Sequence, residues 1–297
     1  MLASKGSTVS TMPGKKHKRP EEHTMPARTQ YAVLVAALLL AVASFPARCA
    51  TPSNLEQAYS VLQSAEFIDL THAFSPTSPH WKGFAPETVT TLFTIPKAGF
   101  HVESFCHPGQ WGTHVDPPAH FHDGLKTVDQ IDPREFLLRL VVIDVHQKVA
   151  KDPDYVVTLQ DIRDWESRHG PIPAGAFVAL RTDWSKRWPD MASMQNLDTH
   201  GVAHYPGWSK PVLQYLYEQR KITASGHETT DTDPGSAVSK DDYSLESYLL
   251  GTNHFQIELL ANLDRVPEAG GLVMVSFPKP QNGSGFPARV VALVPKN

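Results

Sequence analysis

Apolar and polar positions follow two patterns along this chain, and together they predict a mixture of strands and helices. Short, nearly continuous apolar runs predict strands, whereas apolar residues three and four positions apart predict helices. Strands are expected at residues 67–72, 139–145, 177–181, 272–277 and 289–294. Helices are expected at residues 54–63, 158–170, 209–216 and 244–250. No internal repeat or interior linker divides the sequence, so we expect a single α/β domain.

The first 50 residues follow a different pattern. Residues 1–24 are polar and basic, and we expect them to be disordered or to lie upstream of a true start at Met25. Arg28 and the apolar run 31–43 then have the layout of a secretory signal peptide, with cleavage after Ala43, Ala47 or Ala50 left open. The run is shorter than the roughly 20 residues of a membrane span. We therefore expect residues 1–50 to be a leader plus signal peptide and residues 51–297 to form an exported domain, periplasmic or secreted. The alternative is a retained N-terminal anchor.

Charge and cysteine content narrow the functional classes. The first 50 residues hold 7 Lys and Arg and 2 Asp and Glu, which leaves 20 basic against 29 acidic residues in the rest of the chain. A body with a net charge of −9 is a poor nucleic-acid binder, because neutralising phosphates requires clustered cations. Cys49 and Cys106 are the two cysteines, and we expect two separate thiols rather than a disulfide.

Residues 110–122, Gln-Trp-Gly-Thr-His-Val-Asp-Pro-Pro-Ala-His-Phe-His, concentrate the candidate chemistry. His114 and Asp116 are two positions apart, so an extended backbone points both side chains to one side. Gln110 has the same parity, and His120 follows a Pro-Pro pair. Mixed nitrogen and oxygen donors with a spare histidine are suited to a metal ion that activates water. The alternative is a His-rich surface turn.

The pattern Gly-Thr-His-x-Asp-x-Pro-x-His resembles the signature of the cyclase family of metal-dependent hydrolases, which includes bacterial kynurenine formamidase and isatin hydrolase. The resemblance extends from about Ile68 to the C-terminus. It implies a single domain with a swivelling β/β/α fold, assembly into homodimers or homotetramers, and hydrolysis of a small-molecule amide, lactam or lactone.

The resemblance also implies roles for individual residues. His114 and Asp116 match metal ligands, Gln110 is a candidate third ligand, and His120 matches the proton-transfer histidine. Glu258, in the segment Gln256-Ile-Glu-Leu-Leu-Ala-Asn-Leu-Asp264, matches a further ligand. The alternative for Glu258 is a carboxylate at a strand edge.

Two departures from the family pattern bear on the identity of the ion. Gln110 and Glu246 occupy positions where two-metal members of the family have histidines. Replacing imidazoles by oxygen donors favours one harder divalent ion, manganese over zinc. His254 is four residues before Glu258 and would face the same side of an extended strand, so it is an alternative ligand.

Two loops complete the expected site. A Pro-rich loop carries Trp81, which we interpret either as a lid on the substrate pocket or as part of a structural arm. The loop 226–235 resembles a family loop, in which Glu228 and Asp231 would orient histidines. A solvated turn would have the same composition.

We therefore expect a metal-dependent hydrolase of carbon–nitrogen bonds, in which His120 carries the proton of a metal-activated water. No Gly-x-Ser-x-Gly, dinucleotide-binding or Cys-x-x-Cys motif favours another chemistry. The alternative from another class is an exported metal- or small-ligand-binding protein without turnover.

Overall fold

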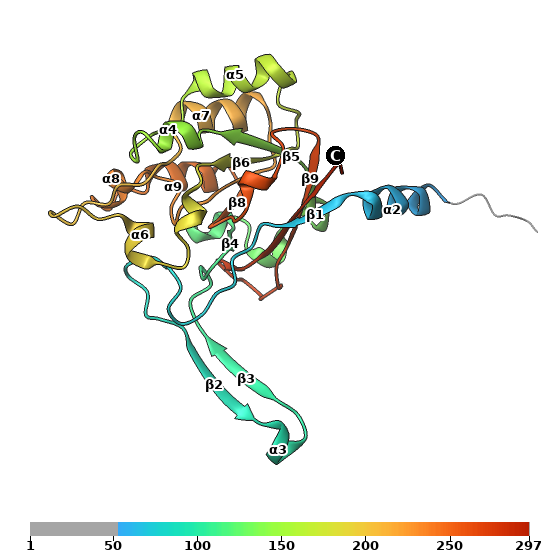
Figure 1. Ribbon diagram of the computed structural model, residues 1–297, viewed down its shortest axis with the longest axis vertical. Coiled ribbons are helices and arrows are strands. Elements are labelled where there is room, and N and C mark those ends of the chain that lie inside the picture. Colours follow the sequence, from blue (N-terminus) through green and yellow to red (C-terminus); the bar gives the residue numbers. More distant parts are fainter. Residues whose placement is uncertain (1–52, 297) are drawn as a thin grey trace, which may run out of the picture. The chain divides into compact units, whose positions relative to one another are not determined.

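The computed structural model describes residues 53–296, and one mixed sheet forms the frame of this part of the chain (Figure 1). The strand order is β1-β11-β9-β5-β6-β7-β8-β4-β10. The strands are β1 Glu66–Asp69, β4 His114–Asp116, β5 Leu137–Asp144, β6 Phe177–Arg181, β7 Ala224–His227, β8 Phe255–Glu258, β9 Gly271–Ser276, β10 Phe286–Pro287 and β11 Arg289–Val294. The signal peptide, the start at Met25 and Cys49 lie outside the described residues.

The centre of the sheet is parallel and its edges are antiparallel. Strands β5, β6, β7 and β8 run parallel, while β4 pairs antiparallel with β8 and β9 pairs antiparallel with β5. Side chains of β5 alternate between two hydrophobic cores, with Val141 and Ile143 in one and Leu140 and Val142 in the other. Burial on both faces explains why the strand sequences are almost continuously apolar. The predicted α/β fold is confirmed.

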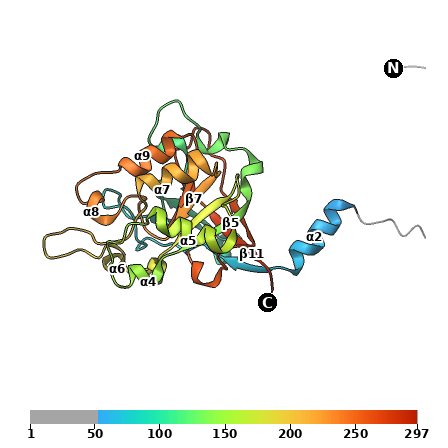
Figure 2. The same cartoon turned by 90° about the horizontal axis from the view of Figure 1, so that it is seen from above.

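Helices cover one face of the sheet. They are α4 His146–Val149, α5 Leu159–His169, α6 Met191–Gln195, α7 Lys210–Gln214, α8 Gly235–Val238 and α9 Ser244–Gly251, with α2 Asn54–Ser64 before the first strand. Figure 1 shows α4, α5 and α7 together on one side of the sheet, and in Figure 2 α7 and α9 lie beside β7. Thr158 forms a capping box with Asp161 at the start of α5. Helix α7 continues as a π-helical segment, Tyr215–Gln219.

A two-stranded hairpin projects from the body (Figure 1). It consists of β2 Thr88–Phe93 and β3 Val102–Cys106, with the short helix α3 Ile95–Ala98 at its tip. Every residue of both strands is exposed, and Cys106 is a free, exposed thiol. The sequence patterns did not predict this hairpin, because neither strand buries a face in the core.

Candidate metal centre

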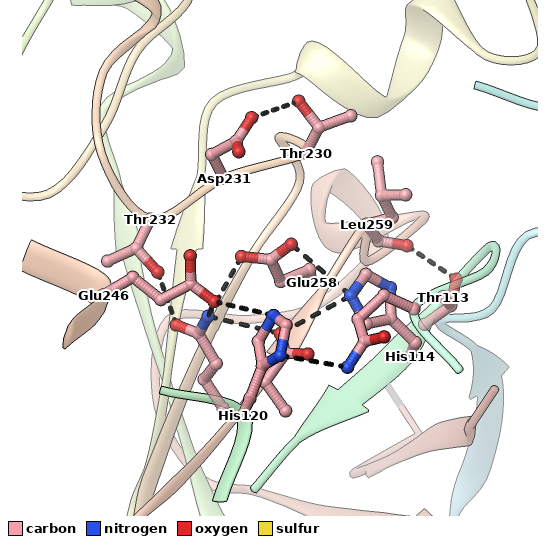
Figure 3. Close-up of polar contacts among 12 residues, drawn as sticks. Thr113, His114, His120, Thr230, Asp231, Thr232, Glu246, Glu258 and Leu259 are labelled. Atoms are coloured by element: carbon pink, nitrogen blue, oxygen red, sulfur yellow. Dashed lines mark hydrogen bonds and ion pairs between the residues drawn. The ribbon is translucent and has the colours of Figure 1, made fainter. Parts of the chain in front are cut away.

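The centre is built on two adjacent strands, β4 and β8. Their antiparallel register places His114 opposite Glu258 and Asp116 opposite Gln256. Residues two apart on a strand share a face, so all four side chains project to the same side of the sheet. The Nε2 atom of His114 lies 3.4 Å from Oδ2 of Asp116 and 3.5 Å from Oε2 of Glu258 (Figure 3). These three residues are 4%, 0% and 4% exposed. They form a group whose donor atoms lie close enough to hold one ion.

A second group shares Asp116 with the first. It adds His120, from the 3-10 turn Pro118–His120, and Glu246, from α9. The Nε2 atom of His120 lies 3.9 Å from Oε1 of Glu246, and the side chain of His120 is 28% exposed. Unlike the residues on β4 and β8, His120 therefore reaches solvent.

Gln256 connects the carboxylates of both groups. Its amide nitrogen donates hydrogen bonds to Asp116 (3.3 Å), Glu246 (3.2 Å) and Glu258 (2.9 Å). The hydroxyl of Thr232 donates to the amide oxygen of Gln256 at 2.6 Å, which fixes the orientation of the amide. One neutral amide nitrogen cannot neutralise three buried carboxylates, so this site is suited to additional positive charge.

The pKa values of the cluster reflect this excess of negative charge. Burial, followed by repulsion from Asp116 and other carboxylates, raises the pKa of Glu246 well above its ordinary value. Burial, followed by repulsion from Glu246 and Asp116, does the same for the pKa of Glu258. Burial opposes ionisation of Asp116 too, but attraction from His114 outweighs it and lowers the pKa of Asp116.

A buried carboxylate oxygen shows that the donor set fits a divalent ion. Oδ1 of Asp116 is buried and, within the described residues, has no hydrogen-bond partner. A buried carboxylate oxygen without a partner, beside a buried imidazole, is the kind of donor that a divalent cation requires.

His227 lies at the edge of the first group, with Nε2 3.3 Å from Oε1 of Glu258. Burial lowers the pKa of His227 to about 3, so its imidazole is neutral. Nδ1 of His227 accepts the indole N–H of Trp208 at 3.3 Å, so the ring proton is on Nε2, which has no free lone pair for an ion.

The structure brings most of the predicted residues to one place. His114, Asp116 and Glu258 form the first group, and His120 and Glu246 belong to the second. The amide nitrogen of Gln110 donates to the carbonyl of Ser284 at 2.7 Å and lies 3.4 Å from Nδ1 of His120, beside the cluster.

His254 is not brought to the cluster, and the expectation that it substitutes as a ligand is wrong. Its Nδ1 lies 2.9 Å from the carbonyl oxygen of Thr223, at the opposite end of β8 from Glu258. Four residues of strand separate the two side chains by roughly 13 Å. Matching parity places residues on one face but does not bring them within ligating distance.

The loop after β7 is buried, so the solvated-turn interpretation is wrong. Glu228 accepts hydrogen bonds from the backbone and hydroxyl of Thr182 and from the hydroxyl of Ser185. Asp231 accepts from the hydroxyls of Tyr205 and Thr230. These bonds come from hydroxyl and backbone groups rather than from histidines, so the two carboxylates anchor the loop.

The sequence patterns indicated no role for Gln256 or His227. Gln256 has the same parity as Glu258 on one strand, which was a usable signal. His227 ends β7, and its proximity to Glu258 follows only from the pairing of β7 with β8.

A cavity of about 300 Å³ opens above the cluster. Its floor includes His114, His120, Glu246 and Glu258, and its walls are largely aromatic. The wall residues are His80, Trp81, Phe84, Phe121 and Tyr243. Trp81, a candidate lid residue, therefore lines the same cavity as the metal centre.

The fold and the site together define a metal-binding α/β protein, in which a mixed sheet carries a buried histidine–carboxylate cluster on β4 and β8. Residues 68–234 match the family described as Putative cyclase, and the chain belongs to this family. The expected cyclase-like single-domain fold is thereby confirmed.

The similar proteins include isatin hydrolases. An isatin hydrolase of Roseibium aggregatum is 36% identical over 192 residues, covering 62% of this chain and 72% of that protein. Isatin hydrolase A from Labrenzia aggregata, solved with benzyl benzoate, is 32% identical with a TM-score of 0.75, covering 82% of this chain and all of that one. An isatin hydrolase bound to the product analogue thioisatinate is 29% identical with a TM-score of 0.73, covering 92% of this chain and 100% of that one. Together with the cluster, these relatives support a metal-dependent hydrolase.

Proposed function

We propose that this protein hydrolyses the amide bond of a small cyclic amide, with isatin or a close relative as substrate. The observation that carries the proposal is the buried His114–Asp116–Glu258 group at the floor of an aromatic cavity. Similarity to isatin hydrolases supports the choice of a fused-ring lactam.

His114, Asp116 and Glu258 would hold one divalent ion, with Gln110, which lines the same cavity, as a candidate further donor. When bound, such an ion polarises a carbonyl and lowers the pKa of water. Two carboxylates and one imidazole favour manganese over zinc in catalysis, because oxygen donors suit the harder ion.

His120 would carry the proton. Burial lowers its pKa, so its imidazole is neutral at pH 7 and has a free lone pair. Its partial exposure places it at the boundary between the cluster and the cavity. In hydrolysis a carbon–oxygen bond forms and the carbon–nitrogen bond breaks; the imidazole of His120 would accept the proton of the attacking water and return it to the leaving nitrogen.

One ion per chain is expected, because His114, Asp116 and Glu258 are proposed as ligands and His120 is proposed as the proton carrier. The second group, Asp116, His120 and Glu246, could hold an ion only by making His120 a ligand. A proton carrier needs its lone pair free, so the ion is assigned to the first group, His114, Asp116 and Glu258.

We also propose that copies of the chain associate through the hairpin of β2 and β3. Its exposed apolar side chains are Val89, Leu92, Phe93, Ile95, Phe100, Val102 and Phe105, each 37–66% exposed. At roughly 150–250 Å² per large side chain, they expose on the order of 600 Å² of apolar surface. A stable interface buries about 800 Å² per partner, so this surface suits a second copy. Sedimentation of wild type and Phe93→Glu tests this; a monomeric wild type would contradict it.

Export remains a proposal based on the sequence from Arg28 to Ala47. In the described residues no helix is long and apolar enough to cross a membrane. Intact-mass measurement of the secreted or periplasmic protein is expected to show loss of the N-terminus; a full-length mass in the cytosolic fraction would contradict export.

Isatin turnover by metal-stripped protein tests the proposed function. Activity is expected to return with manganese, at one ion per chain, and to a lesser extent with zinc. Metal binding without turnover of isatin or of a panel of lactams and lactones would instead favour the binding-protein alternative. Full activity in the presence of a strong chelator would contradict both.

A further inference from the structure

The outer wall of the cavity is a tight turn, Trp81–Phe84. The backbone N–H of Phe84 donates to the carbonyl of Trp81 at 3.0 Å, and the two rings meet edge to face with centroids 5.2 Å apart. A Cβ added to Gly83 would lie 1.6 Å from the Trp81 ring. The indole therefore lies directly across the backbone of Gly83, and only glycine leaves room for it there.

Two side-chain contacts tie this turn to the segment that enters α9. The indole Nε1–H of Trp81 donates to the hydroxyl of Tyr243 at 2.9 Å. Nζ of Lys82 lies 2.9 Å from Oδ1 of Asp241. Tyr243 immediately precedes α9, which carries Glu246 at the floor of the cavity. The wall and the floor are thus joined through one short segment.

The two contacts differ in strength. Lys82 and Asp241 are 50% and 76% exposed, and a pair so accessible to water contributes little. The Trp81–Tyr243 bond is the less solvated of the two, since the Tyr243 side chain is half-buried and lines the cavity. Trp81 itself is 36% exposed, so it depends on this bond to stay over the cavity.

We propose that Tyr243 is a positioning residue that holds Trp81 as the outer wall of the cavity and thereby sets substrate selectivity. With the wall in place, the cavity of about 300 Å³ is at the small end of ligand sites, about 300–1,000 Å³. It selects flat, fused-ring amides over amides with a bulky substituent on nitrogen. This inference rests on the proposed hydrolysis of cyclic amides and goes beyond it by naming what limits the substrate.

The test compares Tyr243→Phe, which removes only the hydroxyl, and Gly83→Ala, which displaces the indole, with wild type. The KM for isatin is expected to rise roughly three- to tenfold, the effect of losing one hydrogen bond. The kcat should change less, because Tyr243 is proposed to act through Trp81. The preference for isatin over N-benzylisatin, measured as a ratio of kcat/KM values, should fall by at least the same factor. Tyr248→Phe is the matched control, because Tyr248 is on α9 and donates to Glu218, which is outside the cavity lining.

Hydrogen exchange supplies a readout that does not depend on turnover. In Tyr243→Phe the peptide containing residues 81–84 should exchange faster than in wild type and in Tyr248→Phe. Unchanged exchange would overturn the positioning role. Faster exchange with an unchanged isatin preference would overturn the selectivity claim. A wild type inactive on both amides would overturn the proposed substrate and with it the selectivity claim, while exchange would still decide whether Tyr243 holds the wall.

Discussion

The floor and the rim of the cavity are built in different ways. The floor donors are on two paired strands, and the backbone register places His114 opposite Glu258. The rim is the outer wall Trp81–Phe84, and one hydrogen bond to Tyr243 and one exposed ion pair between Lys82 and Asp241 hold it. Substitutions in the floor should therefore act on the ion and on the reaction, whereas substitutions in the rim should act on the choice of substrate.

The floor also carries an electrostatic cost that the rim does not. Asp116, Glu246 and Glu258 converge on the single amide nitrogen of Gln256 in a buried site. Buried like charges destabilise the fold unless protons or a cation neutralise them. Because the sheet and α9 hold these carboxylates together, metal binding and folding stability are linked at the floor.

The largest effect is expected for Asp116→Ala, because Asp116 belongs to both groups of donors. The variant should lose the ion, and its rate should fall by more than the roughly 10²–10⁴-fold typical of a lost proton carrier. Elemental analysis beside turnover checks this. Asp123→Ala, which removes an exposed carboxylate near His120, is the control. Full metal content in Asp116→Ala would contradict the assignment.

A smaller effect is expected for Gln256→Leu, which keeps the volume but removes the amide. Groups that orient metal ligands typically contribute 10–100-fold in affinity, so metal affinity should fall by about that factor. Titration of stripped protein with manganese measures it. An unchanged affinity would show that the carboxylates do not need the amide to hold their positions.

Metal removal should make the free energy of unfolding depend on pH through the carboxylates of the floor. The folded-state pKa values of Glu246 and Glu258 are raised, so the folded protein binds more protons than the unfolded chain above the ordinary carboxyl pKa. Ionisation of these carboxylates should therefore destabilise stripped protein as pH rises through the raised values. Glu246→Gln keeps a neutral side chain at every pH, so the Tm of stripped wild type should fall by several degrees relative to that of stripped Glu246→Gln from pH 5 to pH 8. Bound manganese should remove most of this difference. A Tm difference between the two proteins that does not change with pH would contradict the shifts.

The smallest effect on the site is expected for Asp161→Asn, outside both floor and rim. Burial opposes ionisation of Asp161, but bonds from Lys148 and Thr158 outweigh it and lower its pKa. The carboxylate therefore stabilises the fold above its unfolded pKa, and this stability is lost as pH falls through the lowered value. The variant should unfold about 1–2 kcal/mol more easily at pH 7, with unchanged metal content and substrate preference. A changed preference would show that the rim is not independent of the helical layer.

The contrast between floor and rim also explains which residues of the site could be predicted from the sequence. His114, Asp116 and His120 belong to one contiguous motif, so residue type and spacing marked them as candidates, and the family resemblance supplied their roles. Glu258 came from a second motif by resemblance. Gln256 has the same parity as Glu258, which is a local signal, but its place opposite Asp116 follows from the pairing of β8 with β4. His227 reaches the site through the pairing of β7 with β8, which local patterns do not encode.

The rim was less predictable because its main contact joins residues that are far apart in the sequence. The contact between Trp81 and Tyr243 joins residues 162 positions apart through a single hydrogen bond. The hairpin of β2 and β3, which lies outside the rim, was missed for a different reason: it has no core-facing side, so its strands lack the periodicity that marked the others. His254 was misplaced because parity carries no information about distance along a strand.

The division of labour between the metal ligands and the proton carrier is the central claim, and one paired measurement tests it most directly. His120→Ala and His114→Ala are purified in parallel and analysed for bound manganese and for isatin kcat. We expect His120→Ala to keep one ion per chain while kcat falls roughly 10²–10⁴-fold, and His114→Ala to lose the ion. If His120→Ala loses its ion as readily as His114→Ala, or keeps near-normal turnover, the assignment of His120 as proton carrier is contradicted.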